Sequence, residues 1–226
     1  DYGIPGRFDI FGPNAEVDFF TDANPSRESY SVYAQTTYSF SDVFRIVSGL
    51  RYSEDTFTTD VTNFLNVESF QEEGTADEIT SRVVAEVDFS EDLMGYFALA
   101  RGFKPGGSNL TFGFDDDNAP PMVFPTFEAE TVDSVEFGLK STFADGAARA
   151  NIAVFSYTYE NLQFQATDPD IYRGGVANIP ESEMSGLEIE FTGFLTDSLS
   201  LDMNLAFLDS EVTSDYEVLD NVDAYP

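Results

Sequence analysis

Four pairs of amphipathic segments, each pair joined by a turn of two or three residues, follow one another along the chain. The pairs are 29–40 with 43–52, 79–89 with 93–103, 131–143 with 147–164, and 185–195 with 198–208. Longer, acidic connections separate the pairs and cover residues 53–78, 104–130 and 165–184. Short turns at one end of the strands and long loops at the other are typical of a transmembrane β-barrel. The layout therefore predicts an all-β fold, namely a wall of about eight antiparallel strands.

Apolar and polar side chains alternate along most of these segments, which is the period of a strand with two different faces. Phe44 and Ile46, for example, alternate with Arg45. Charged residues at strand centres suit a polar lumen, and the apolar face then suits lipid. A soluble β-sandwich, whose outer faces are also polar, is an alternative. The segments 93–103 and 147–164 are apolar on both faces in places, so the pattern does not assign their faces.

Aromatic residues gather toward the ends of the predicted strands. Tyr38, Phe40 and Phe44 lie at one end of the first pair, and Tyr52 lies at the other. Rings in these places are typical of the interfacial girdles of membrane barrels, although Phe and Tyr are also frequent in ordinary strands.

Composition excludes several classes of function. The 226 residues include 42 Asp and Glu but ten Lys and Arg, and the net charge of -32 would repel nucleic acid. The 23 Phe and 11 Tyr are unlike a disordered acidic tail. The sequence has no cysteine and no histidine, so it has no thiolate metal site and lacks the commonest general base. Without a nucleophile set or a phosphate-binding glycine loop, the chain is not expected to be an enzyme or to carry a cofactor.

No stretch approaches the roughly 20 apolar residues of a transmembrane helix, whereas a barrel strand needs only about 9–11 residues. The sequence begins at Asp1 and stops at Pro226, where another strand is due. We therefore expect residues 1–226 to be a partial barrel domain. A free-standing eight-stranded barrel, which would be a passive, porin-like protein, is the alternative.

Several segments resemble, in order, the barrel of TonB-dependent outer-membrane receptors. The most specific match is 96–109, YFALARGFKPGGSN, which is similar to the family's RGFKPGGFN element. The likeness is strongest to the siderophore-receptor branch that includes the pesticin/yersiniabactin receptor, although acidic residues often replace basic or neutral ones here. Further matches are SVYAQTTY (31–38), SGLRYSED (48–55), EAETVDSVEFGLKS (128–141), AVFSYTYENLQ (153–163) and GGVANIPESEMSGLEIE (174–190).

The resemblance implies a Gram-negative outer-membrane protein whose barrel has 22 strands, with short periplasmic turns and long extracellular loops. An N-terminal plug domain and the remaining strands would then be absent from this chain. The implied activity is uptake of a scarce ligand, most specifically a ferric siderophore, driven by the TonB–ExbB–ExbD complex through the plug. Outer-membrane lipid, including lipopolysaccharide, would surround the wall.

Candidate contacts to the ligand or to the plug come from three places. The cationic strand exit supplies Arg101 and Lys104, the loop after it supplies Asn109, and the strand end near the predicted vestibule supplies Asn161 and Gln163. Two carboxylates on one face of a later strand complete the set, and these are Glu188 and Glu190.

The motif also has a purely structural interpretation. Pro105 would end the ladder, and Gly106 and Gly107 would supply unusual dihedral angles; the motif residues assigned this role are Gly102, Phe103, Pro105, Gly106 and Gly107. In the next loop, three consecutive carboxylates are weak candidates for calcium ligands, because they lack the spacing of an EF-hand: Asp115, Asp116 and Asp117. A solvated acidic loop is the alternative there.

Overall fold

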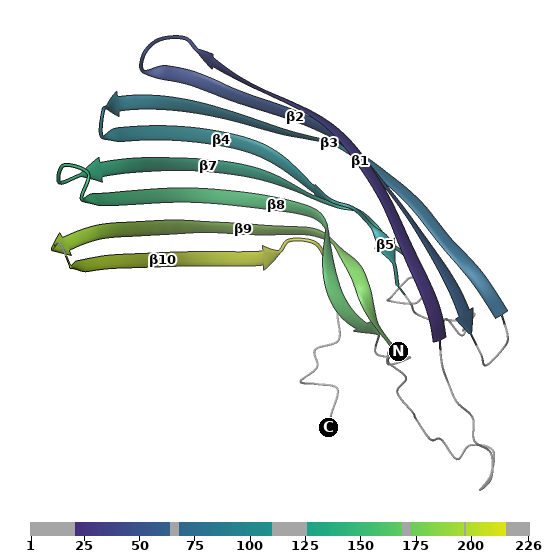
Figure 1. Cartoon of the computed structure of the whole chain (residues 1–226). Helices are drawn as coiled ribbons and strands as arrows, with labels where there is room; N and C mark the ends of the chain where they lie inside the picture. Colours follow the sequence, from purple (N-terminus) through teal and green to yellow (C-terminus); the bar gives the residue numbers. More distant parts are fainter. Residues whose placement is uncertain (1–20, 64–67, 110–125, 169–172, 197, 216–226) are drawn as a thin grey trace, which may run out of the picture.

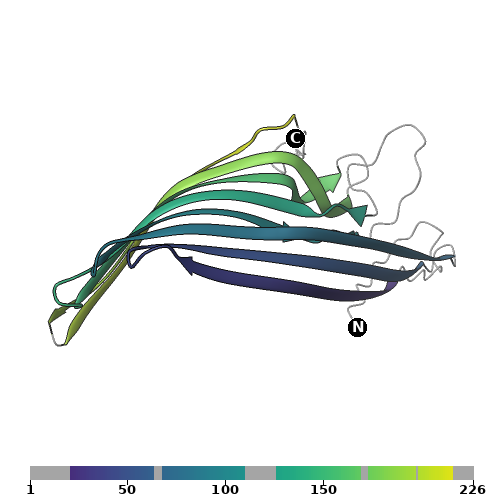
Figure 2. The ribbon, with the colours of Figure 1, turned by 90° about the horizontal axis from the view of Figure 1, so that it is seen from above.

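The protein forms one curved, single-layered sheet of eight antiparallel strands (Figure 1, Figure 2). The computed structural model describes residues 21–63, 68–109, 126–168, 173–196 and 198–215. The sheet order is β1-β2-β3-β4-β7-β8-β9-β10, so neighbours in the sequence of large strands are neighbours in space. The strands are β1 (Thr21–Ser39), β2 (Phe44–Asn63), β3 (Glu68–Ser90), β4 (Leu93–Lys104), β7 (Glu130–Phe143), β8 (Ala148–Asp168), β9 (Arg173–Thr196) and β10 (Leu199–Val212).

A second, two-stranded sheet lies in the connection between β4 and β7. It pairs β5 (Gly107–Ser108) with β6 (Thr126–Phe127). Among the described residues β1 and β10 are not paired, so the eight strands do not close into a small barrel. The same residues form no second large sheet facing the first, as a sandwich would require. No helix in the described part of the chain is long and apolar enough to cross a membrane.

The short turns have the local chemistry that closes a hairpin. In the β7–β8 turn, Asp145 and Gly146 have φ angles of 55° and 86°, and the N–H of Ala147 donates to the carbonyl oxygen of Ala144 at 3.0 Å. Two central residues with positive φ define a type I′ turn, whose twist matches that of the strands. In the β1–β2 turn, Ser41 Oγ accepts from the N–H groups of Val43 and Phe44.

The connections predicted as long loops are largely strands, which corrects the sequence analysis. The ladder between β2 and β3 runs without interruption from Phe44 opposite Val87 to Asn63 opposite Glu68, through most of the predicted loop 53–78. The ladder between β8 and β9 likewise occupies much of 165–184. Where both faces of a hairpin meet water, the alternation that reveals a strand in the sequence is lost. The long connections are therefore protruding hairpins.

The ladder assigns a face to every described strand, including the two that the pattern left open. On β4, Phe97 and Leu99 lie on the outer face, and on β8, Ile152 and Val154 do so. This face is apolar and open to the surroundings, with exposed fractions of 71% for Val32 and 53% for Phe137. The opposite, inner face is polar and charged, and its residues include Arg45, Glu86, Tyr96, Lys140, Asn151 and Glu190.

Aromatic rings mark both ends of the apolar band. Near the short turns, the ring centres of Phe40 and Phe44 are 5.3 Å apart, and those of Tyr38 and Phe40 are 4.7 Å apart. At the other end, the hydroxyls of Tyr30 and Tyr52 both donate to Glu54 Oε2, at 3.0 and 3.1 Å. The stretch from Phe44 to Tyr52 has nine residues, within the roughly 9–11 that a spanning strand uses.

Two glycines of the inner face let aromatic rings lie flat across the sheet. A Cβ at Gly138 would collide with the ring of Tyr96 on the neighbouring strand, and a Cβ at Gly186 would collide with the ring of Phe155. A ring that covers a glycine restores the packing that the missing side chain would have supplied. These contacts matter because the described sheet buries no large side chain fully.

The assignment of faces predicts opposite effects for neighbouring positions on β8. We expect Val154→Arg to destabilise the folded protein in lipid by about 2–4 kcal/mol, because it places a cation on the apolar band. Asn151→Arg is the matched control on the inner face, where its neighbour Glu190 is an acceptor. The measurement is the urea dependence of folding into phospholipid vesicles, with the protein at full native length. Equal losses for the two variants would contradict the assignment of faces.

Candidate functional site

The segment that follows β4 turns back between the protruding ends of two hairpins. We call residues 104–109 and 126–130, which include β5 and β6, the latched hairpin. One side of it is bonded to β8 and β9, and the other side is bonded to β1 and β2, as the contacts below describe. In Figure 1, β5 lies between the bend of β8 and β9 on one side and the far halves of β1–β3 on the other. The motif at 96–109 therefore leads into the latched hairpin, which is held at the end of the wall opposite the short turns. We call this end the wide end or the mouth.

Two asparagine side chains imitate strand pairing on the β9 side. Asn109 donates to the carbonyl oxygen of Val176 at 2.7 Å and accepts from its N–H at 2.8 Å. Asn178 likewise donates to the carbonyl oxygen of Glu128 at 3.0 Å and accepts from its N–H at 2.7 Å. An amide side chain offers a donor and an acceptor in one plane, as a backbone unit does. Both ends of the latched hairpin are thus attached to β9.

Gln163 adds a third attachment, from β8. Its side-chain amide donates to the carbonyl oxygens of Pro105 and Glu128, at 2.9 and 3.2 Å, and its backbone N–H donates to Glu130 Oε2 at 2.8 Å. Its neighbour Asn161 has a φ angle of 54°, and its carbonyl oxygen accepts from Asn178 at 2.8 Å. A left-handed residue is uncommon within a strand and bends it.

The opposite side of the latched hairpin is attached to β1 and β2. Arg27 donates to the carbonyl oxygen of Gly106, and its Nε lies 3.1 Å from Oδ1 of Asp55, which is 7% exposed. The hydroxyls of Thr59 and Ser108 lie 2.7 Å apart. Sequence analysis did not find Arg27, Asp55, Thr59 or Asn178, because each partner lies far away in the sequence and no local motif marks them.

The glycine of the motif is required by close backbone approach. A Cβ on Gly106 would collide with the carbonyl oxygen of Phe127, and backbone atoms cannot move aside as a flexible side chain can. A Cβ on Gly107 would meet the ring of Phe127. Gly102 faces Val132 on β7 in the same manner. The unusual dihedral angles predicted for Gly106 and Gly107 are not found, because Gly146 is the one described glycine with a positive φ. The structure gives close contacts as the reason for these glycines instead.

Arg101 lies where β4 parts from β3, and its charge is shared by three carboxylates. Its guanidinium is 2.7 Å from Asp133, 3.3 Å from Glu78 and 3.9 Å from Glu160. In the ladder it shares the outer face with Phe97 and Leu99 and follows them at the end of the apolar band. Ion pairs of this kind join β3, β7 and β8 just outside the band.

The Lys104 ammonium is held by fewer carboxylates than the Arg101 guanidinium. Its side chain is 59% exposed and its Nζ lies 4.0 Å from Oε2 of Glu130, at the limit of an ion pair. Exposed pairs of this length contribute little to stability. Lys104 is therefore a cation of the mouth whose charge is only weakly compensated.

The inner face of the wall carries charges of both signs. Near the short turns, Arg45 bonds Glu86 at 2.5 Å and Asp88 at 2.6 Å. Further along, the Tyr96 hydroxyl donates to Glu136 at 2.5 Å. Glu188 and Glu190, which the sequence placed on one face, both lie on this inner face and are exposed. Asn151 donates to Glu190 at 3.0 Å.

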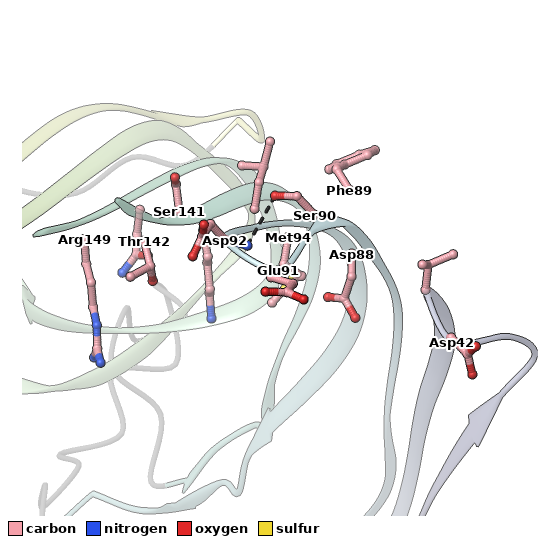
Figure 3. A pocket seen from close by; sticks show the side chains of 14 residues that line it. Asp42, Asp88, Phe89, Ser90, Glu91, Asp92, Met94, Ser141, Thr142 and Arg149 are labelled. Carbon is pink, nitrogen blue, oxygen red and sulfur yellow. Dashed lines mark hydrogen bonds between the residues drawn. The ribbon is translucent and has the colours of Figure 1, made fainter. Parts of the chain in front are cut away.

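A hollow of about 850 Å³ opens on the inner side at the short-turn end (Figure 3). Asp88, Met94 and Arg149 point into it, whereas Phe89 points away toward the outer face. Ser90 Oγ accepts from the N–H of Asp92 at 3.2 Å and holds the turn that forms its rim. The hollow is open, and both charged and apolar side chains line it.

The predicted calcium candidates Asp115, Asp116 and Asp117 lie outside the described residues. Within the described ranges, no three or more Asp and Glu side chains come together in a way that could hold a metal ion.

Comparisons with known proteins agree with this geometry. The family model for the TonB dependent receptor-like β-barrel matches residues 1–225. The pesticin receptor of Yersinia enterocolitica is 28% identical over 200 residues, covering 84% of this chain and 27% of that protein. The probable TonB-dependent siderophore receptor PiuA of Acinetobacter baumannii is 28% identical over 197 residues, covering 85% and 25%. This chain thus spans about a quarter of the length of these curated relatives.

Solved structures show the same fold. The ferric yersiniabactin uptake receptor FyuA from Yersinia pestis superposes with a TM-score of 0.70 at 22% identity, covering 86% of this chain and 28% of the other. The fold and the family model therefore define an outer-membrane β-barrel of the receptor class. The chain belongs to the TonB-dependent receptor β-barrel family, whose members lie in the outer membrane of Gram-negative bacteria.

The attachment of the latched hairpin makes a prediction for Asn178. We expect Asn178→Ala to remove three hydrogen bonds and to cost about 1–3 kcal/mol of local stability, because the backbone of Glu128 loses its partner. Hydrogen exchange of residues 126–130 should rise. Asn151→Ala, which removes one exposed bond to Glu190, is the control and should leave that exchange unchanged. Unchanged protection in Asn178→Ala would show that these bonds do not hold the hairpin.

Proposed function

We propose that this chain is part of the barrel wall of a TonB-dependent receptor that imports a ferric siderophore. The observation that carries the proposal is a wall that is apolar outside and charged inside, with a hairpin latched across its wide end. In this proposal the plug domain and the remaining strands belong to the same protein but lie outside residues 1–226. The plug would pass energy from the TonB–ExbB–ExbD complex.

Each region of the wall has a place in this function. The outer face contacts outer-membrane lipid, including lipopolysaccharide at its extracellular end. The protruding hairpins stand on the extracellular side and surround the entry path. The inner face binds the plug, and the hollow of Figure 3 lies at the periplasmic end, where the plug leaves the wall. The wall performs no covalent chemistry.

The candidate residues take different roles in this proposal. Asn109 and Gln163 position the latched hairpin through bonds to backbone groups and to Glu130. Asn161 supports it indirectly, because its carbonyl oxygen accepts from the side chain of Asn178. Lys104 remains a candidate for contact with an anionic ligand at the mouth, since its charge is weakly compensated. The charge of Arg101 is already shared by three carboxylates, so we assign it to the wall itself.

The proposed function is tested by uptake of iron. We expect deletion of the gene that encodes this chain to abolish growth of iron-limited cells on at least one ferric siderophore in a panel of hydroxamate, catecholate and carboxylate types. Uptake of ⁵⁵Fe from that siderophore should fall to the level of a tonB deletion. Complementation is the control. Unchanged growth and uptake on the whole panel would exclude siderophore import.

The proposed contact with the plug predicts a permeability defect. We expect Glu188→Lys with Glu190→Lys to loosen the plug, since like charges would replace ion pairs with basic plug residues. Cells carrying this pair should become several-fold more sensitive to an antibiotic too large for ordinary porins. Glu183→Lys with Glu211→Lys, an outer-face pair that changes the charge equally, is the matched control. Equal sensitivity of the two double variants would argue against a plug contact at Glu188 and Glu190.

A further inference from the structure

Four cations in the described part of the chain have no carboxylate within ion-pair distance. They are Arg51, Arg82, Lys140 and Arg149, and all four lie on the inner face. Other described cations do form ion pairs: Arg27 pairs with Asp55, and Arg101 pairs with Asp133. With 42 Asp and Glu against ten Lys and Arg, carboxylates are not scarce. Lys140 Nζ lies 5.2 Å from the centre of the Tyr96 ring, which is a cation–π contact. The three arginines without a carboxylate partner need another account.

Arg51 and Arg82 are the two that lie next to one another. Arg51 is opposite Thr80, and Arg82 is opposite Gly49, so the two arginines are diagonal neighbours on adjacent strands. Diagonal neighbours have Cα atoms roughly 7–8 Å apart. Guanidinium groups carried by neighbouring positions repel each other, and an anion that lies between them relieves the repulsion.

Small residues leave the space over these arginines open. The inner-face positions beside Arg82 are Gly49 on β2 and Ala98, Ala100 and Gly102 on β4. Arg51 and Arg82 line a hollow of about 400 Å³ together with Tyr33, Gln35 and Thr80. These neighbours offer hydroxyl and amide donors in addition to the two guanidinium forks. The hollow therefore suits an acceptor-rich group.

The nearest carboxylates are engaged elsewhere. Glu78, a diagonal neighbour of Arg51, bonds Arg101 at 3.3 Å. Glu86, further along the strand of Arg82, bonds Arg45 at 2.5 Å. Arg51 donates from Nε to Ser53 Oγ at 3.0 Å, and no described carboxylate forms an ion pair with Arg51 or Arg82.

The hollow is reached from the wide end of the wall. A second hollow, also of about 400 Å³, shares Arg51, Thr80 and Arg101 with the first and extends to Pro105 at the base of the latched hairpin. Arg149 and Lys140 instead line the hollow at the short-turn end. The two arginines are therefore on the path of a ligand that enters at the mouth.

We infer that Arg51 and Arg82 form an anion subsite for the imported chelate, which takes its carboxylate or catecholate oxygens. The inference rests on the proposed function and specifies the charge of the preferred substrate. The two arginines select an anionic ferric chelate over a neutral one. Arg forks bind such oxygens in pairs, and bonds between charged groups are stronger than neutral ones. Tyr33, 75% exposed, supplies a ring and a hydroxyl at the edge of the site.

The test measures the binding of ferric chelates of different charge to the purified protein at its full native length. The probes are ferric citrate and a ferric tris-catecholate, both anionic, and a ferric trihydroxamate without net charge. We expect an anionic chelate to bind to the wild type, and Arg51→Gln or Arg82→Gln to weaken it by about tenfold or more, the usual effect of losing a bond between charged groups. Arg149→Gln, which removes the same charge from the other end of the inner face, is the matched control and should bind as the wild type does.

The outcomes separate the subsite from the transport function. Affinity for anionic chelates that is equal in Arg51→Gln, Arg82→Gln and Arg149→Gln overturns the subsite, even if uptake of iron is confirmed. If the two variants instead lose thermal stability with unchanged affinity, the arginines bind carboxylates of the plug, which also overturns it. Arginine-dependent binding of an anionic chelate, without any uptake defect in the deletion strain, supports the subsite and excludes siderophore import.

Discussion

Pairing of the backbone N–H and C=O groups across neighbouring strands is the interaction on which the rest of this structure depends. A single-layered sheet with lipid on one side has no interior in which side chains could provide a core, and none of the described large side chains is fully buried. An unpaired backbone group in lipid would cost several kcal/mol. The ladder therefore runs unbroken over long stretches, for example from Phe44 to Asn63 on β2. The side chains of each face match its surroundings, apolar on the outer face and polar on the inner face. Glycines covered by aromatic rings add the packing that a one-layered wall can provide.

Backbone pairing leaves the side chains of the inner face free to vary with function. Because pairing already holds the strands, inner positions can carry charged residues without destroying the fold. Some of these charges are compensated within the wall, as with Arg45 and its two carboxylates, and others are left for what enters or fills the lumen. At the wide end, side-chain amides form the hydrogen bonds that backbone groups form elsewhere in the sheet. Asn109 and Asn178 hold a connecting segment against β9 with paired bonds like those of a strand.

Much of the wall was predictable because its two faces meet different solvents. The alternation of Phe44 and Ile46 with Arg45 assigned the faces correctly, and the rings at Tyr38, Phe40 and Tyr52 marked the ends of the band. The prediction was wrong about the extent of the loops, since 53–78 and 165–184 are mostly strand. There both faces meet water and the pattern has no reason to alternate. Arg101 was singled out for its charge, but its three carboxylate partners come from β3, β7 and β8, which no local pattern could join.

By itself, the sequence determined the eight strands of the large sheet, the lipid-facing side and the likeness to TonB-dependent receptors, because these follow from short-range alternation, turn chemistry and motif. Only the tertiary structure decided which polar residues meet. The latched hairpin depends on contacts between residues about 30 to 80 positions apart, such as Arg27 with Gly106 and Gln163 with Pro105. The same holds for the pairing of some arginines and the isolation of Arg51 and Arg82, since register, and not proximity in the sequence, brings charges together across strands.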